Sequence, residues 1–553
     1  MLSGRHDLTK VIGEKTVSSD VSYVLMFLGA LLWLFAILST RIWWIDPQYE
    51  FGLLQVLPIH FWAGLVCYIV GLLTTIRQVG KNTFLSLLLL LNFMITGVPV
   101  TVESNARIHD AWWHLATART IVDSGNMESR ESLPFMYLNW PGSFIFTALA
   151  VITSDVPVFS YIRVFPLISS SIFLMGYYLS ISQLVKNEFH RRYGAIAILF
   201  FDPWLQFHNS PQAFALMLLP LILFTLPKSG RKWTLMTLLL YSSAVISHPI
   251  TSIFLLLVTT TSYLMRQTLN SSAQRSQVNP VLLVTLLMAW LMHNATQVFN
   301  NNIARVAENI WNVSLVDQSL ALLQRRSVLL PSSIRLTTCL FAVILTLTHL
   351  VLGRRGPKIL SLAMGWTAAI VFLSVYDLAF LGGSFNDRSF MFLGLLTAPL
   401  SIEFLIEHRV SKPSTSPLRT CIGVAVLCLL AGNFYTLYYF ENDFVVNDRN
   451  IAAVKFVSGY VSTHMELFGN RLSVAFAYKT NLNIVALYFH ETQSVPLQSI
   501  VVFDSHSLLS TSPHMKSSRT MKALYIEYAG NPRASSIYNN GLFSMCYVTP
   551  ASL

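Results

Sequence analysis

Residues 83–102 read TFLSLLLLLNFMITGVPVTV and contain no charged side chain. A helix needs about 20 mostly apolar residues to cross a bilayer, so this stretch predicts a membrane-spanning helix. Similar runs recur along the chain of 553 residues, which is 54% hydrophobic and 11% charged, with a mean hydropathy of +0.55. This composition excludes an ordinary soluble globular protein and predicts an α-helical polytopic membrane protein.

The apolar runs predict about thirteen membrane segments. Several of them are shorter than a full span, and the pairs on either side of Asn209 and His248 could instead be broken helices. The predicted segments are 21–40, 52–76, 83–102, 157–185, 193–207, 211–227, 233–247, 249–266, 279–297, 335–352, 358–381, 388–406 and 419–440.

Basic residues in the loops predict the orientation of the chain. With the N-terminus in the cytoplasm, nearly every second loop carries Lys or Arg, which is the positive-inside pattern. The net charge of +11 therefore indicates loops that face anionic membrane lipids, and no nucleic-acid partner. The basic loop residues are Arg77, Lys81, Lys186, Arg191, Arg192, Lys228, Arg231, Lys232, Arg266, Arg275, Arg354, Arg355, Lys358, Arg409, Lys412 and Arg419. We expect a multi-pass protein of the plasma membrane with its N-terminus inside and its C-terminus outside.

The chain divides into a cytoplasmic N-terminus (1–20), a transmembrane domain (21–440) and an external C-terminal domain (441–553). Within the first large external loop (103–156), the run 142–153 is apolar but too short to span, so we expect it to lie flat on the outer leaflet. The tail has strand-like stretches such as Leu472–Ala477 and Ile484–Phe489, which predict a small α/β or mostly β domain.

A charged stretch follows the third membrane segment: Ile108–Gly125 reads IHDAWWHLATARTIVDSG. On a helix, Asp110 and His114 share one face, at i and i+4. An Asp110 carboxylate at the membrane boundary can act as a general base or hold a divalent cation. Alternatively, Asp110 is the N-cap of a helix that starts at Ala111. His109 and His114 could bind zinc with a carboxylate, although interfacial histidines usually contact water and lipid headgroups.

Polar residues also occur where the middle segments reach the external face. Asp202 and His208 lie in FFDPWLQFHNSPQ, and His248 lies in SHPIT, between two apolar runs. Charged groups near membrane depth are costly, which favours functional roles. Asp202 could instead cap a helix end, and His248 could belong to an ordinary turn.

Two arginines open helices on the same predicted face. Asp387 and Arg388 begin one segment. A guanidinium at a helix N-terminus can bind a phosphate through two parallel hydrogen bonds. Arg163, in YIRVFP, offers the same interpretation. Both could instead be snorkelling interfacial arginines. We favour Arg388 over Arg163 as the phosphate-binding residue.

The segment HDAWWHLATARTIVDSG resembles the first external loop of the GT-C glycosyltransferase superfamily, which includes the oligosaccharyltransferases and the protein mannosyltransferase and aminoarabinose transferase families. Trp140-Pro141 and the flat helix after it also look like this superfamily, and the tail stretch SIYNNGLFSMCYV is reminiscent of archaeal members. The residues that carry the loop resemblance are Asp110, Trp112, Trp113, His114, Arg119 and Gly125.

The resemblance implies a GT-C-like fold and transfer of a sugar from a polyprenyl-phosphate-linked donor on the external face, within membrane lipids. Asp110 would be the catalytic base or a ligand of an activating Mg²⁺ or Mn²⁺, with Asp202 as its second ligand. Arg388 would stabilise the leaving phosphate. The remaining candidates, expected to bind substrate, are His109, His114, Arg119, Arg163, Asp202, His208, His248 and Asp387.

One departure from the superfamily limits the acceptor. Oligosaccharyltransferases carry a WWD-type motif in the external domain, whereas the last tryptophan here is Trp366. Transfer to a lipid, glycan or protein hydroxyl is therefore favoured over transfer to asparagine. Two alternatives stay open: a transporter or flippase of a lipid-linked or anionic substrate, and a catalytically silent relative that organises envelope assembly.

Overall fold

The computed structural model describes most of the helical region and part of the C-terminal region. The described residues are 19–40, 53–103, 105–126, 139–201, 208–268, 278–296, 300, 326–352, 357–380, 386–410, 431–432, 451–453, 455–456 and five strands. The side chains of 19, 109, 201, 326–332, 357–358, 376–380, 386–388, 390 and 408–410, and those of the strands, are outside this description.

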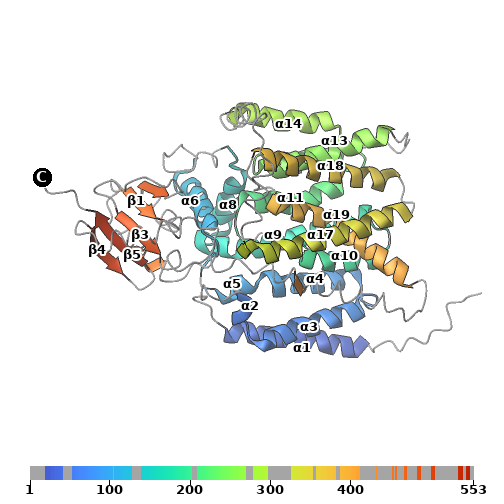
Figure 1. Cartoon of the computed structure of the whole chain (residues 1–553), viewed down its shortest axis with the longest axis horizontal. Coiled ribbons are helices and arrows are strands. Elements are labelled where there is room, and N and C mark those ends of the chain that lie inside the picture. Colours follow the sequence, from blue (N-terminus) through green and yellow to red (C-terminus); the bar gives the residue numbers. More distant parts are fainter. Residues whose placement is uncertain are drawn as a thin grey trace, which may run out of the picture.

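Long helices run side by side in one bundle (Figure 1). They are α1 (Ser19–Ser39), α3 (Ile59–Thr75), α4 (Lys81–Thr96), α9 (Val158–Ser180), α10 (Glu188–Phe201), α11 (Pro211–Thr225), α12 (Arg231–Val245), α13 (Pro249–Thr268), α14 (Pro280–His293), α17 (Arg326–Leu352), α18 (Pro357–Phe380) and α19 (Asn386–Val410). The remaining described helices are α2 (Leu53–Val56), α5 (Val98–Val102), α6 (His109–Ser124), α8 (Gly142–Ser154) and the 3₁₀ turn η2 (Ile181–Gln183).

The prediction of a largely helical fold is confirmed. Every predicted membrane segment up to 388–406 overlaps a described helix, whereas 419–440 lies outside the described residues except for 431–432. By length and composition, three described helices can cross a membrane: Asp20–Ser39, Val158–Gln183 and Ser333–Leu352. The outer surface of the bundle is apolar, as lipid contact requires: Leu38 and Val351, for example, are 74% and 76% exposed.

The broken-helix alternative around His248 is wrong. Helices α12 and α13 end and begin as separate elements and pack against each other. The Tyr241 hydroxyl donates to the Ser252 carbonyl at 3.3 Å, so the two helices form an antiparallel hairpin whose turn contains His248. The turn before α11 is partly outside the described residues, and the same alternative around Asn209 stays open.

Helices α1 and α3 approach each other closely because glycines line their contact. A Cβ atom on Gly29 would lie 2.6 Å from the Tyr68 nitrogen, and one on Gly64 would lie 2.7 Å from the Gly29 oxygen. Small residues at helix contacts allow such close packing in membranes, where van der Waals contact replaces the hydrophobic effect. The Trp33 indole N–H donates to the Met94 carbonyl at 3.0 Å and ties this pair to α4.

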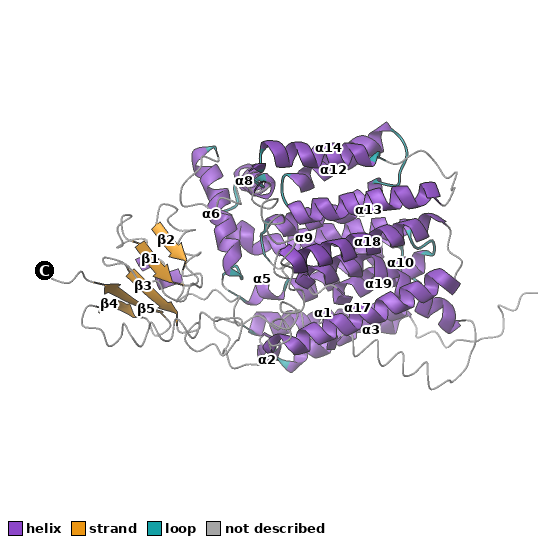
Figure 2. Cartoon of the chain, turned by 45° about the horizontal axis from the view of Figure 1, so that its top comes forward, coloured by secondary structure: helices purple, strands orange, loops and turns teal. Residues whose placement is uncertain are grey.

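A five-stranded sheet lies beyond one end of the bundle, next to α6 (Figures 1 and 2). Its order is β2-β1-β3-β5-β4, with parallel pairs β1–β2 and β1–β3 and antiparallel pairs β3–β5 and β5–β4. Strand β2 overlaps the predicted strand 484–489, whereas 472–477 lies outside the described residues. The strands are β1 (Glu466–Gly469), β2 (Asn483–Ala486), β3 (Ile500–Asp504), β4 (Ala534–Asn539) and β5 (Phe543–Val548).

Candidate functional site

The candidate site lies at the end of the bundle that carries α6 and α8, called the α6 end below (Figure 1). Helix α6 begins at His109, so Asp110 lies in its first turn and is exposed to solvent. The cap position belongs to Ile108, which contributes no side-chain capping bond, so Asp110 does not cap a helix that starts at Ala111. The helix dipole favours a carboxylate in the first turn.

The backbone just before Asp110 is strained. Ile108 has a φ of 70° and a ψ of 119°, a conformation that a β-branched residue rarely adopts. Such strain costs about 1–3 kcal/mol and persists only where the surroundings hold it. Trp112 helps to hold this backbone conformation. It is 2% exposed, and its indole N–H donates to the Ala106 carbonyl at 3.0 Å.

The C-terminal half of α6 is occupied by local contacts. The Arg119 Nε lies 3.3 Å from Asp123 Oδ2, and both side chains are partly exposed. Gly125 ends the helix with a φ of 72°, and its N–H donates to the Ile121 carbonyl at 2.9 Å. The glycine of the quoted stretch therefore serves the helix end, because this left-handed conformation favours glycine.

His114 lies one turn after Asp110 and is buried. Its Nδ1 is 2.8 Å from the Asn209 carbonyl, which can only accept, so Nδ1 carries the proton. Burial lowers the pKa of the His114 imidazole, because the charged form loses hydration, while the Asp110 charge and the Asn209 bond raise it. The neutral ring stacks on His208 at 6.0 Å between centroids and lies 5.8 Å from Phe144. The structure thus brings together three residues from the predicted site: Asp110, His114 and His208.

Short polar contacts join the other elements at this end. The Asn209 side-chain amide donates to Thr147 Oγ1 of α8 at 3.5 Å, and the Ser210 hydroxyl caps α11. The Gly142 N–H donates to the Ile246 carbonyl at 2.9 Å. The Trp290 indole N–H donates to the Asn139 carbonyl at 2.9 Å. These contacts fix α6 and α8 to the turn before α11, and they fix the start of α8 to the ends of α12 and α14.

An arginine-rich recess precedes α6. Arg107 binds the buried Glu103 carboxylate through two hydrogen bonds, of 2.6 and 3.1 Å. Arg163 donates to the Val100 carbonyl at 3.1 Å and to the Glu103 carbonyl at 2.6 Å. Arg163 thus stabilises the C-terminal end of α5 rather than snorkelling into lipid headgroups. Both arginines line a small recess at this end, together with Asn105.

Glu103 and Arg107 were not among the predicted site residues. An acid and a base at i and i+4 directly after an apolar run would have been a signal for this buried pair.

The remaining predicted site residues either make local contacts or have side chains outside the described part of the chain. His248 Nδ1 lies 3.3 Å from the Thr251 hydroxyl in the first turn of α13, a local contact at a helix start. His109 opens α6, and Asp387 and Arg388 lie in the first turn of α19, but their side chains are outside the described part of the chain. Asp202 lies outside the described residues, so a Mg²⁺ or Mn²⁺ ion held by Asp110 and Asp202 stays a prediction.

No protein-family model matches the sequence, and a comparison with curated proteins finds no similar sequence. Solved structures with a related arrangement include ArnT from Cupriavidus metallidurans bound to undecaprenyl phosphate, with a TM-score of 0.48 and 10% identity over 84% of this chain and 98% of that one. They also include the Archaeoglobus fulgidus oligosaccharyltransferase in complex with Zn and sulfate. Its TM-score is 0.43 and its identity 11%, over 84% of this chain and 74% of that one. The same enzyme tethered with an acceptor peptide has a TM-score of 0.47 and 11% identity, over 78% of this chain and 71% of that one.

Proposed function

We propose that this protein is a membrane glycosyltransferase. It moves a sugar from a polyprenyl-phosphate-linked donor to a hydroxyl of a lipid, glycan or protein, at the α6 end and on the external face of the plasma membrane. The observation that carries the proposal is the exposed Asp110 carboxylate in the first turn of α6, one turn before a buried neutral His114. This carboxylate lies within the stretch that resembles the first external loop of GT-C glycosyltransferases.

The chemistry needs a base and a group that stabilises the leaving phosphate. The oxygen of the acceptor hydroxyl forms a bond to the anomeric carbon of the sugar, and Asp110 accepts the proton of that hydroxyl. The bond between that carbon and the phosphate oxygen breaks, and the polyprenyl phosphate leaves with the electron pair. Arg388 at the start of α19 is the proposed partner of this phosphate.

The shape of α8 supports a lipid-borne donor. One face of α8 is buried against the bundle through Phe144, Thr147 and Ala148. The opposite face is apolar and exposed, with Leu149 at 55% and Ile152 at 58% exposure. An exposed apolar face on a short helix favours contact with acyl chains at the membrane boundary. Such contact would place the lipid of a donor beside α6, since α6 and α8 pack together.

The test is a transfer assay with the whole protein. The purified chain, reconstituted in liposomes, is incubated with a panel of polyprenyl-phosphate sugars and candidate acceptors, and mass spectrometry follows both products. We expect release of the polyprenyl phosphate together with a glycosylated acceptor. A parallel arm with a chelator tests the predicted Mg²⁺ or Mn²⁺ ion. Movement of an intact lipid-linked sugar across the bilayer, with no bond broken, would contradict the proposal and indicate a flippase.

A further inference from the structure

A second cluster of ionisable side chains lies at the opposite end of the bundle, called the far end below. His190 is in the first turn of α10, His349 in the last turn of α17, and Glu403 and Glu407 lie one turn apart on α19. The turn between α3 and α4 also lies at the far end. Arg192 of α10 is bound to this turn, because its guanidinium donates to the carbonyls of Ile76 and Val79.

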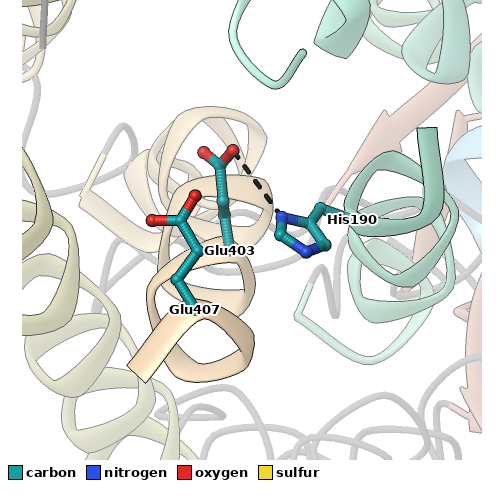
Figure 3. A group of neighbouring side chains, drawn as sticks. All are labelled: His190, Glu403 and Glu407. Carbon is teal, nitrogen blue, oxygen red and sulfur yellow. Dashed lines mark ion pairs between the residues drawn. The ribbon is translucent and has the colours of Figure 1, made fainter. Parts of the chain in front are cut away.

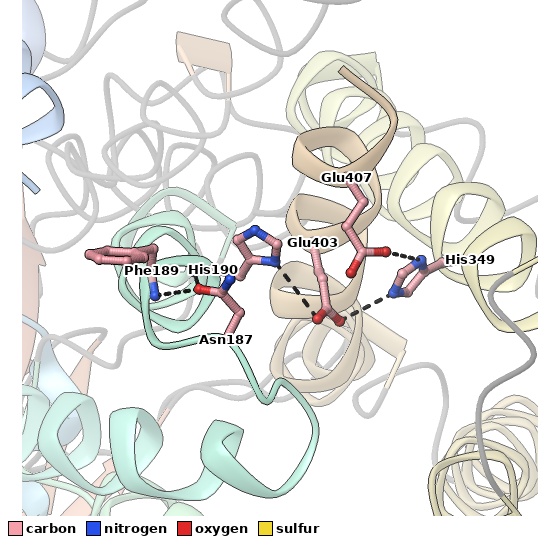
Figure 4. Close-up of polar contacts among 6 residues, drawn as sticks. All are labelled: Asn187, Phe189, His190, His349, Glu403 and Glu407. Carbon is pink, nitrogen blue, oxygen red and sulfur yellow. Dashed lines mark hydrogen bonds and ion pairs between the residues drawn. The ribbon is translucent and has the colours of Figure 1, made fainter. Parts of the chain in front are cut away.

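The four side chains converge from three helices (Figures 3 and 4). His190 Nδ1 lies 3.8 Å from Glu403 Oε1. The imidazole of His349 lies between the two carboxylates, with Nε2 3.1 Å from Glu403 Oε2 and Nδ1 3.9 Å from Glu407 Oε2. His349 and Glu403 are 0% and 3% exposed, so the centre of the cluster is dry.

The buried Glu403 carboxylate needs a positively charged partner. Taking ionised groups out of water costs several kcal/mol per ion unless they are paired. Protonated imidazoles or a bound cation would both neutralise the cluster. The ligand atoms of His190, Glu403 and Glu407 all lie within 4.8 Å of one another, which is close enough to share one ion.

The types of donor atom in this cluster favour a transition-metal ion. Zinc binds imidazole nitrogen and carboxylate oxygen at about 2.0–2.2 Å, so neighbouring ligand atoms in a tetrahedron lie about 3.3–3.6 Å apart. The separation of 3.8 Å between His190 Nδ1 and Glu403 Oε1 is slightly wider than this, so both side chains would move closer together on binding zinc. An imidazole in the ligand set favours Zn²⁺ over Mg²⁺ or Ca²⁺, which prefer oxygen ligands.

We propose that His190, Glu403 and Glu407 form a Zn²⁺ site that joins α10 to α19 at the far end, with His349 as a positioning residue that holds the Glu403 carboxylate. This site is separate from the Asp110 site and does not depend on the transferase activity. Helix α19 packs extensively on both α10 and α17, so the ion would stabilise the contact at which the three helices meet.

Metal content and metal binding test the proposal directly. The full-length protein, purified without a polyhistidine tag or chelator, is analysed by elemental mass spectrometry, and we expect about one zinc per chain. The stripped protein is then titrated with Co²⁺, whose visible absorption reports nitrogen and oxygen ligands. The variants Glu407→Gln and His190→Gln should bind Zn²⁺ at least about tenfold more weakly. The control His293→Gln changes an exposed histidine of α14 and should bind like the wild type.

A second measurement covers the effect on folding. Zn²⁺ should raise the melting temperature of the stripped wild type and of His293→Gln, but not that of Glu407→Gln. Glu407 is 41% exposed, so its replacement leaves the bundle folded. A wild type that carries no zinc and gives no Co²⁺ spectrum would overturn the proposal and leave a proton-sharing His–Glu cluster. Equal binding by wild type and both ligand variants would overturn it as well.

Discussion

At the scale of single residues, the α6 end combines an exposed acid with a buried neutral imidazole. Asp110 stays in water in the first turn of α6, while His114 is held by the Asn209 carbonyl beneath it. Ile108 just before them keeps a strained positive φ. Strain of this kind concentrates at functional sites, where it fixes the direction of a reacting group. We infer that the connection into α6 aims the Asp110 carboxylate.

The buried His114 predicts a dependence of stability on pH. Its pKa in the folded protein is below the ordinary value of 6.5, so the unfolded chain binds more protons at acidic pH. The free energy of unfolding should therefore fall as the pH drops below about 6.5. The variant His114→Asn keeps a donor for the Asn209 carbonyl but cannot be protonated. Its melting temperature should decrease less between pH 7.5 and pH 5 than that of the wild type, and equal decreases would contradict this role of His114.

Two arginines near the site should differ in their contribution to stability. Arg163→Gln removes charged hydrogen bonds to the carbonyls of Val100 and Glu103, each of which contributes about 1.5–3 kcal/mol. Arg119→Gln removes a partly exposed ion pair with Asp123, whose contribution is about 0–1 kcal/mol. Thermal unfolding in detergent compares the two variants. A smaller loss for Arg163→Gln than for Arg119→Gln would show that the α5 contact is not structural.

At the scale of elements, Gly64 predicts how tightly α1 and α3 must pack. A Cβ atom there would lie 2.7 Å from the Gly29 oxygen and 2.7 Å from the Trp33 nitrogen, and backbone atoms cannot move aside singly. Gly64→Ala should lower the free energy of unfolding by about 1–3 kcal/mol, as overpacking does. Gly80→Ala is the control, because its Cβ would meet only the Thr83 hydroxyl, at 4.0 Å. Similar melting temperatures for both variants would refute close packing of α1 on α3.

Most helices could be predicted from the sequence, because each apolar run is long enough to require burial in lipid or protein. The short apolar run 142–153 likewise corresponds to α8. The start of α6 was predicted less well, since the cap position belongs to Ile108 and not to a capping side chain. The pattern also left open whether His248 breaks a helix, and only the contact between Tyr241 and Ser252 shows a hairpin.

The candidate sites were only partly predictable, because tertiary structure brings together residues from distant parts of the chain. Asp110 and His114 are one turn apart and were found from their spacing. The stacking of His114 on His208 joins α6 to the turn before α11, and no local pattern encodes it. The same applies to His190 and Glu403, which meet across α10 and α19.

At the scale of the whole molecule, the two ends of the bundle carry different chemistry. The α6 end holds the proposed transfer site and the far end holds the proposed Zn²⁺ site. The proposed orientation predicts that only the α6 end is accessible from outside the cell. A cysteine introduced at the exposed Ser124 should react with an impermeant maleimide in intact cells. A cysteine at the exposed Ser229, between α11 and α12, should react only after the membrane is permeabilised. The reverse pattern would contradict the orientation.

The central claim is that Asp110 is the base of a sugar transfer at the α6 end. Its most direct test compares Asp110→Asn with Asp123→Asn in the reconstituted transfer assay, because both replace an exposed aspartate of the same helix. A missing general base costs about 10²–10⁴-fold in rate, so Asp110→Asn should lose transfer by that factor while its melting temperature stays unchanged. Asp123→Asn should keep the wild-type rate. Full transfer activity in folded Asp110→Asn would contradict the account.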